Sequence, residues 1–218
     1  MSRIVKSEFP EQSPPPSVKK AAILNAAKAR FARYGFSKVT MDEIAHDIGI
    51  VKGAVYYYFP TKEKIFEEVI REVQEAFLGE IENLLHRNST SGRKLSGYVR
   101  IRQRYLDRLE NIGQLDYESW QKIRPSFQEL FSEFQDREVS CLQKILEEGR
   151  ATGEFSLSET RNHAMLFLRS IKGLRLLNAL HRSAPRQESP KPNEEIQFLT
   201  AVFLDALRRR TERRTSRQ

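Results

Sequence analysis

The chain has 218 residues, of which 39% are hydrophobic and 30% are charged, and its net charge at pH 7 is +8. This composition is ordinary for a globular protein with an apolar core. No window approaches the roughly 20 consecutive apolar residues of a membrane span. The first residues lack the apolar core of a signal peptide, and the single cysteine, Cys141, excludes an intrachain disulfide. We therefore expect a cytoplasmic protein.

The positive charge lies at the two ends of the chain. Residues 1–65 contain 11 Lys and Arg against 6 Asp and Glu, and residues 208–218 contain 6 Arg against one Glu. Each end therefore carries a net charge of +5, and the middle carries −2. Basic ends around a slightly acidic body indicate contact with a polyanion such as nucleic acid. A solubilising tail would give the same sum.

Residues 1–16 are rich in Pro, Ser and Glu and predict a flexible arm. Helical periodicity fills the remainder of the chain, so we predict an all-α protein. Ser17 is the expected N-cap of the first helix, and Thr40 with Glu43 has the spacing of a capping box for the second. Thr61 is the expected N-cap of the fourth.

The third helix is predicted between Lys52 and Phe59, after a turn that begins at Gly49. The second and third helices are each too short to be stable alone in water, so they must pack against the first and fourth. This arrangement is a helix-turn-helix, and its second helix is the one that enters the major groove in nucleic-acid binders.

The residues around this turn suit contact with phosphates. Lysine charges, tyrosine and threonine hydroxyls and a glycine that lets DNA approach the backbone all occur here. Ile44, Val55 and Phe59 are the expected apolar anchors of the unit. Tyr58 fits a half-buried packing residue as well as it fits a phosphate donor.

The stretch GFSKVTMDEIAHDIGIVKGAVYYYFPTKEKIF, from Gly35 to Phe66, resembles the DNA-binding domain of the TetR family of bacterial transcriptional regulators. The resemblance is dense over residues 17–77. It implies an N-terminal three-helix helix-turn-helix domain and a larger C-terminal helical domain that binds a small-molecule effector. It also implies a homodimer, formed through the last two long helices, that binds a palindromic operator. Repression is the commoner behaviour in this family.

The resemblance also implies roles for single residues. The positions that match DNA-backbone contacts in the family are Thr40, Lys52, Gly53, Tyr56, Tyr57 and Lys62. Ala54 matches a position that reads a base edge, although a methyl group reads little beyond a thymine methyl. The residue before Lys52 is often Ser or Thr in the family, and here it is Val51. The loss of this side-chain cap costs about 1 kcal/mol of helix stability.

We therefore expect four segments. They are the flexible arm (1–16), the DNA-binding domain (17–77), the helical effector-binding and dimerisation domain (78–207) and a basic tail (208–218). Within the third segment, Ser126 and Glu129 have the spacing of a second capping box. Residues 163–180 are apolar almost all round a helix, so they need cover on more than one side, either from a partner subunit or from the rest of the same chain.

Aromatic residues of the C-terminal half could line an effector pocket, or they could simply form core. The candidates are Tyr105, Tyr117, Trp120, Phe131 and Phe167. Arg102 could balance an anionic ligand or lie in water.

An enzyme is not indicated. The four histidines are far apart in sequence, and no metal-ligand spacing or Gly-rich phosphate loop occurs. We expect no metal and no other cofactor. The alternative is a helical protein-interaction module without specific DNA binding. That alternative explains the helices, but it explains neither the basic ends nor the Lys-Gly-Tyr-Tyr surface.

Overall fold

The computed structural model describes residues 15–113, 124–181 and 192–215, and these residues contain helices and no strand. The chain begins with α1 (Pro16–Tyr34), the 3₁₀ turn η1 (Phe36–Lys38), α2 (Met41–Asp47) and α3 (Lys52–Tyr58). It continues with α4 (Lys62–Leu85), α5 (Ser91–Gly113), the 3₁₀ turn η2 (Arg124–Phe127), α7 (Gln128–Ala151), α8 (Thr160–His181) and α9 (Pro192–Thr215). The predicted all-α fold is confirmed. No helix in these three described ranges is long and apolar enough to cross a bilayer.

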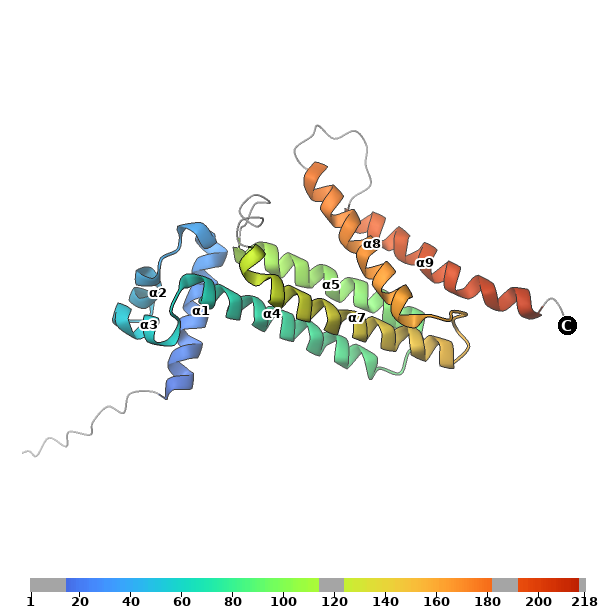
Figure 1. The fold of residues 1–218 in the computed structure, drawn as a ribbon, viewed down its shortest axis with the longest axis horizontal. Helices are drawn as coiled ribbons and strands as arrows, with labels where there is room; N and C mark the ends of the chain where they lie inside the picture. Colours follow the sequence, from blue (N-terminus) through green and yellow to red (C-terminus); the bar gives the residue numbers. More distant parts are fainter. Residues whose placement is uncertain (1–14, 114–123, 182–191, 216–218) are drawn as a thin grey trace, which may run out of the picture.

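The molecule has a small head and a larger body, which share α4. The head comprises α1, η1, α2, α3 and the first half of α4, and it lies at one end of the molecule (Figure 1). The body comprises the second half of α4 with α5, α7, α8 and α9. The last two of these helices lie side by side, away from α2 and α3 (Figure 1).

The predicted starts of α2 and α4 are confirmed. The Thr40 hydroxyl accepts a hydrogen bond from the Glu43 amide at 3.3 Å, and the Glu43 carboxylate accepts one from the Thr40 amide at 2.8 Å. The Thr61 hydroxyl accepts from the Lys64 amide at 3.3 Å. These contacts satisfy backbone donors that have no partner within the first turn of a helix.

Two other predicted helix starts are wrong. α1 begins at Pro16 rather than after Ser17, because proline at the first helical position has a suitable φ and lacks the amide that would need a cap. α7 begins at Gln128, with Phe127 as an N-cap that makes no side-chain hydrogen bond. The start of α7 is held by the burial of Phe127 and not by the predicted capping box, since Phe127 is only 2% exposed and packs into the head core.

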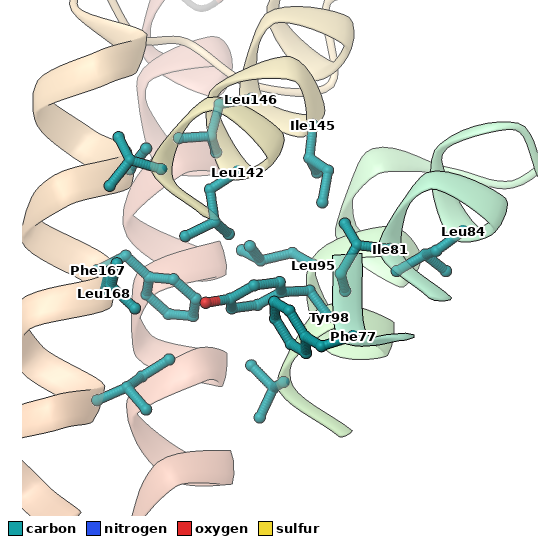
Figure 2. Close-up of a cluster of buried hydrophobic side chains, with 14 of the residues drawn as sticks. Phe77, Ile81, Leu84, Leu95, Tyr98, Leu142, Ile145, Leu146, Phe167 and Leu168 are labelled. Carbon is teal, nitrogen blue, oxygen red and sulfur yellow. The ribbon is translucent and has the colours of Figure 1, made fainter. Parts of the chain in front are cut away.

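The head and the body have separate apolar cores, and α4 contributes to both. Its first half places Ile65, Phe66 and Val69 in the head core. Its second half places Phe77 and Ile81 in the body core, where Figure 2 shows them beside Tyr98 of α5 and across from Leu142 of α7 and Phe167 of α8. A residue's position along α4 therefore decides which core it stabilises.

The head core also contains two residues from beyond the predicted DNA-binding segment. Phe127 of η2 and Leu130 of α7 are both buried in it. The Phe127 ring lies 5.9 Å from the ring of Phe66, centroid to centroid, in an edge-on arrangement. The body thus completes the core of the head.

A buried ion pair joins α5 to α7 inside the body. The Arg102 Nε donates to a Glu138 carboxylate oxygen at 2.8 Å, and the Tyr98 hydroxyl donates to the same oxygen at 2.6 Å. Glu138 is fully buried and Arg102 is 4% exposed. Burial, together with the Glu138 charge, raises the pKa of Tyr98 well above its ordinary value, so this phenol stays protonated and keeps donating.

This geometry predicts a strong asymmetry between single and double substitutions. Glu138→Leu leaves the Arg102 charge buried without a partner, and it should lower the free energy of unfolding by about 3–5 kcal/mol. Arg102→Met combined with Glu138→Leu removes both charges and should cost clearly less than Glu138→Leu alone. Urea denaturation followed by circular dichroism measures both values. A double variant less stable than the Glu138→Leu variant would contradict the prediction.

Candidate nucleic-acid interface

The candidate interface is the outer surface of α2 and α3. Each of these helices has seven residues, and Gly49, at φ +66°, turns the chain between them. Glycine suits this position because other residues rarely adopt a positive φ. Ile44 and Val55 are fully buried and Phe59 is 3% exposed, so the predicted anchors fix both helices to the head core.

The opposite side of α3 faces solvent. Tyr57 is 83% exposed and Tyr56 is 43% exposed, so both phenols can reach a ligand outside the chain. Among the described residues, a Cβ built on Gly53 would meet no atom within 4 Å, which leaves open space beside the backbone. Tyr58 is half-buried against the head core, and its ring lies edge-on to Tyr57. The packing interpretation of Tyr58 is confirmed.

Lys52 lies in the first turn of α3 and links it to α2. Its ammonium is 2.8 Å from the Asp42 carboxylate and 5.7 Å from the centre of the Tyr56 ring. The hydrogen bond to Asp42 raises the pKa of Lys52, so the side chain remains charged. Both partners are exposed, and exposed ion pairs are weak. A phosphate can therefore compete with Asp42 for this ammonium.

Thr40 is the N-cap of α2. Its hydroxyl donates to the Glu43 carboxylate at 2.9 Å, in addition to the two capping contacts. Hydrogen bonds from the Thr40 backbone and side chain hold the pKa of Glu43 below its ordinary value. Arg30 of α1 also lies 3.1 Å from this carboxylate, so Thr40 and α1 are held in one network.

Lys62 behaves differently from Lys52. Its ammonium donates to the Phe36 carbonyl at 2.9 Å and lies 4.4 Å from the centre of the Phe36 ring. Burial lowers its pKa. The side chain therefore fastens the start of α4 to η1. An ammonium has three donors, so contact with Phe36 leaves capacity for a phosphate oxygen.

Comparison with known proteins gives the same assignment at the family level. The family model described as "Bacterial regulatory proteins, tetR family" matches residues 23–69. The chain is 27% identical over 122 residues to the HTH-type transcriptional repressor KstR2 of Mycolicibacterium smegmatis. It is 39% identical over 62 residues to the HTH-type transcriptional regulator RutR of Escherichia coli.

Solved structures extend the likeness to the whole fold. A crystal structure of a transcriptional regulator from Cytophaga hutchinsonii has a TM-score of 0.78 and 30% identity, over 87% of this chain and 98% of that one. The chain belongs to the TetR family. A TetR/AcrR-family regulator from Thermobifida fusca, with a TM-score of 0.61 and 20% identity over 88% of this chain and 99% of that one, shares the fold.

The curated TetR-family relatives are matched only in part. The match spans 50% of this chain and 60% of KstR2, and 28% of this chain and 29% of RutR. The likeness to RutR is therefore limited to 62 residues. The family assignment covers the fold, whereas the ligands and targets of these relatives are properties of those proteins.

The departure from the family pattern at Val51 is visible in the structure. Val51 is the N-cap of α3, makes no side-chain hydrogen bond there and is 75% exposed. Ala54, one turn further along the helix, is partly exposed. Val51 and Ala54, which come before and after Lys52 in sequence, therefore carry methyl groups at the start of α3.

The three effector-pocket candidates that the structure describes do not gather into one lining. Tyr105 and Phe167 are 3% and 1% exposed and belong to the body core, whereas Phe131 is half-buried against the head core. Tyr117 and Trp120 lie outside the described residues. Arg102, which the sequence offered as a balance for an anionic ligand or as a solvated charge, is buried and paired with Glu138.

The two interface lysines should respond differently to substitution. Lys62→Ala removes a hydrogen bond from a charged donor to the Phe36 carbonyl, so it should lower the free energy of unfolding by about 1–2 kcal/mol. Lys52→Ala removes only an exposed ion pair and should leave the free energy of unfolding nearly unchanged. Thermal unfolding of both variants in the absence of DNA makes the comparison. Equal stability losses would show that Lys62 does not fasten α4 to η1.

Proposed function

We propose that this chain is a transcriptional repressor that binds a palindromic DNA operator as a homodimer and is released by a small-molecule effector. The observation that carries this proposal is the exposed side of α3, where Lys52, Gly53, Tyr56 and Tyr57 face solvent on a TetR-family head. Operator binding places the protein in the bacterial cytoplasm.

The proposed contacts follow from the chemistry of that surface. Lys52 and Lys62 supply charge to phosphates, Thr40, Tyr56 and Tyr57 supply hydroxyls, and Gly53 allows close approach of the DNA. Ala54 faces the bases. The proposed segments are the flexible N-terminal arm (1–16), the head with the start of α4 (17–77), the body (78–207) and the basic tail (208–218). A protein-interaction module without DNA binding accounts for none of these surface residues.

The proposed dimer interface is the outer face of α8 and α9. Leu166 and Leu177 of α8 are 61% and 53% exposed, and Phe198 of α9 is 72% exposed. A hollow of about 540 Å³ between the two helices is lined mainly by apolar side chains, including Leu174 and Phe198. Contiguous exposed apolar surface of this kind favours a protein partner.

Gly173 of α8 is a second reason to place the dimer interface on this face. A Cβ at this position would meet no atom of the described chain within 4 Å, so close packing within the chain does not explain the glycine. Gly173 lies two turns from Leu166 and one turn from Leu177, and therefore on the same side of α8. A helix from a second copy can approach closely at a residue without a side chain.

Tyr57→Phe tests the DNA-contacting surface. Loss of a phosphate hydrogen bond in each protomer should weaken binding of the dimer by about 1–3 kcal/mol in total. The loss should be similar for operator and unrelated DNA, because phosphate contacts carry little sequence information. Fluorescence anisotropy with DNA from upstream of the gene measures it, and Tyr34→Phe on α1 is the matched control. A change in base preference would contradict the assigned role.

Phe198→Glu and Leu177→Glu test the dimer. Each places a charge in the proposed apolar interface, and an unpaired buried charge is costly. Both variants should therefore sediment as monomers at concentrations at which the unmodified chain is a dimer. Val18→Glu, at an exposed valine on α1, is the control and should leave the dimer intact. If the Phe198→Glu variant remains a dimer, the dimer interface is not the outer face of α8 and α9.

A further inference from the structure

The outer side of α3 presents a short row of three side chains. Val51, Ala54 and Tyr57 are spaced by three residues and therefore lie on neighbouring positions of one helix face. Val51 is 75% exposed and Tyr57 is 83% exposed, while Ala54 is partly exposed. Tyr57 ends in a hydroxyl, but the other two members of the row offer only methyl groups.

Val51 weakens the helix that it precedes. It makes no side-chain cap, and a serine or threonine at the same position could supply one. Its side chain is also not used in the head core, where the next valine, Val55, is fully buried. Single exposed apolar residues are common on protein surfaces. Val51 differs because groups suited to phosphate surround it.

The groups suited to phosphate contact are close to Val51 and Ala54 in the sequence. Lys52 lies between them in sequence, and its ammonium is turned toward Asp42 of α2 and the Tyr56 ring. Gly53 leaves open space beside the backbone. When the cations and hydroxyls hold phosphates, the methyl groups of Val51 and Ala54 are the parts of the row directed at the groove.

Methyl groups have no hydrogen bonds to offer a base. They can discriminate only by apolar contact, and the apolar group that a base pair displays in the major groove is the 5-methyl of thymine. Every base also presents polar groups in the major groove, including O4 of thymine, but only thymine adds a methyl group that a valine or alanine can contact. The chemistry of this row therefore selects thymine.

We propose that Val51 and Ala54 are specificity-determining residues that read thymine methyl groups in each half-site of the operator. The inference rests on the proposed DNA-binding function and adds the base that the recognition helix selects. Burial of one methyl group against an aliphatic side chain corresponds to about a fourfold gain in binding constant. Each contacted thymine should contribute about that factor per half-site.

The test removes single methyl groups from the DNA. Duplexes are selected from a random library with the full-length chain, and each thymine of an enriched site is then replaced by deoxyuridine, which differs only in the methyl group. Anisotropy should show about fourfold weaker binding at one or two thymines per half-site. Val51→Ser should abolish the uracil effect at one of them and Ala54→Gly at another, while Val18→Ser on α1 should leave every effect unchanged.

The outcomes separate this inference from the proposed function. If no duplex is enriched, the DNA-binding proposal fails, and this inference fails with it. If a site is enriched but uracil is tolerated at every position, only the thymine inference fails. It also fails if Val51→Ser and Ala54→Gly both keep the full uracil effects. Because Val51→Ser adds a helix cap, loss of folding does not obscure the result for that variant.

Discussion

α2 and α3 depend on packing, because helices of seven residues are not stable alone in water. Ile44 and Val55 supply that packing, and both are fully buried in the head core. Capping adds to it at α2, where Thr40 and Glu43 satisfy each other. Capping does not stabilise the start of α3, because the Val51 side chain makes no cap hydrogen bond. The position of the recognition helix is therefore set almost entirely by the core behind it.

That core is not confined to the head. Phe66 of α4 contacts Phe31 and Phe36 from the head at ring distances of 5.3 and 4.7 Å, and Phe127 of η2 at 5.9 Å. The same helix α4 continues into the body core through Phe77. A rearrangement of the body that moves α4 or Phe127 thus acts on the core that orients α3. This continuity is a physical route by which the proposed effector, bound in the body, would act on the proposed DNA-contacting surface.

Much of the head could be predicted from sequence, because its signals are local. The Thr40 capping box, the Thr61 cap and the turn at Gly49 depend on residues within a few positions of each other, and all three are present. Other contacts join residues that are far apart in the chain, so no local sequence pattern predicts them. Examples are the packing of Phe127 on Phe66 and the ion pair between Arg102 and Glu138. Lys62 shows the same limit. The sequence shows that Lys62 is charged. Its hydrogen bond to the Phe36 carbonyl cannot be predicted in the same way, because it depends on how α4 packs against η1.

We propose that the α2–α3 surface of a dimer binds the phosphates of duplex DNA. The most direct measurement is the binding constant for a selected duplex as a function of salt concentration. Two lysines in each protomer, Lys52 and Lys62, should release about four counterions per dimer, which corresponds to a slope of roughly −3 to −4 in a plot of log K against log salt. Lys52→Ala should reduce the magnitude of this slope by about 2 for the dimer. Binding that is absent, or that does not change with salt, would contradict phosphate binding by this surface.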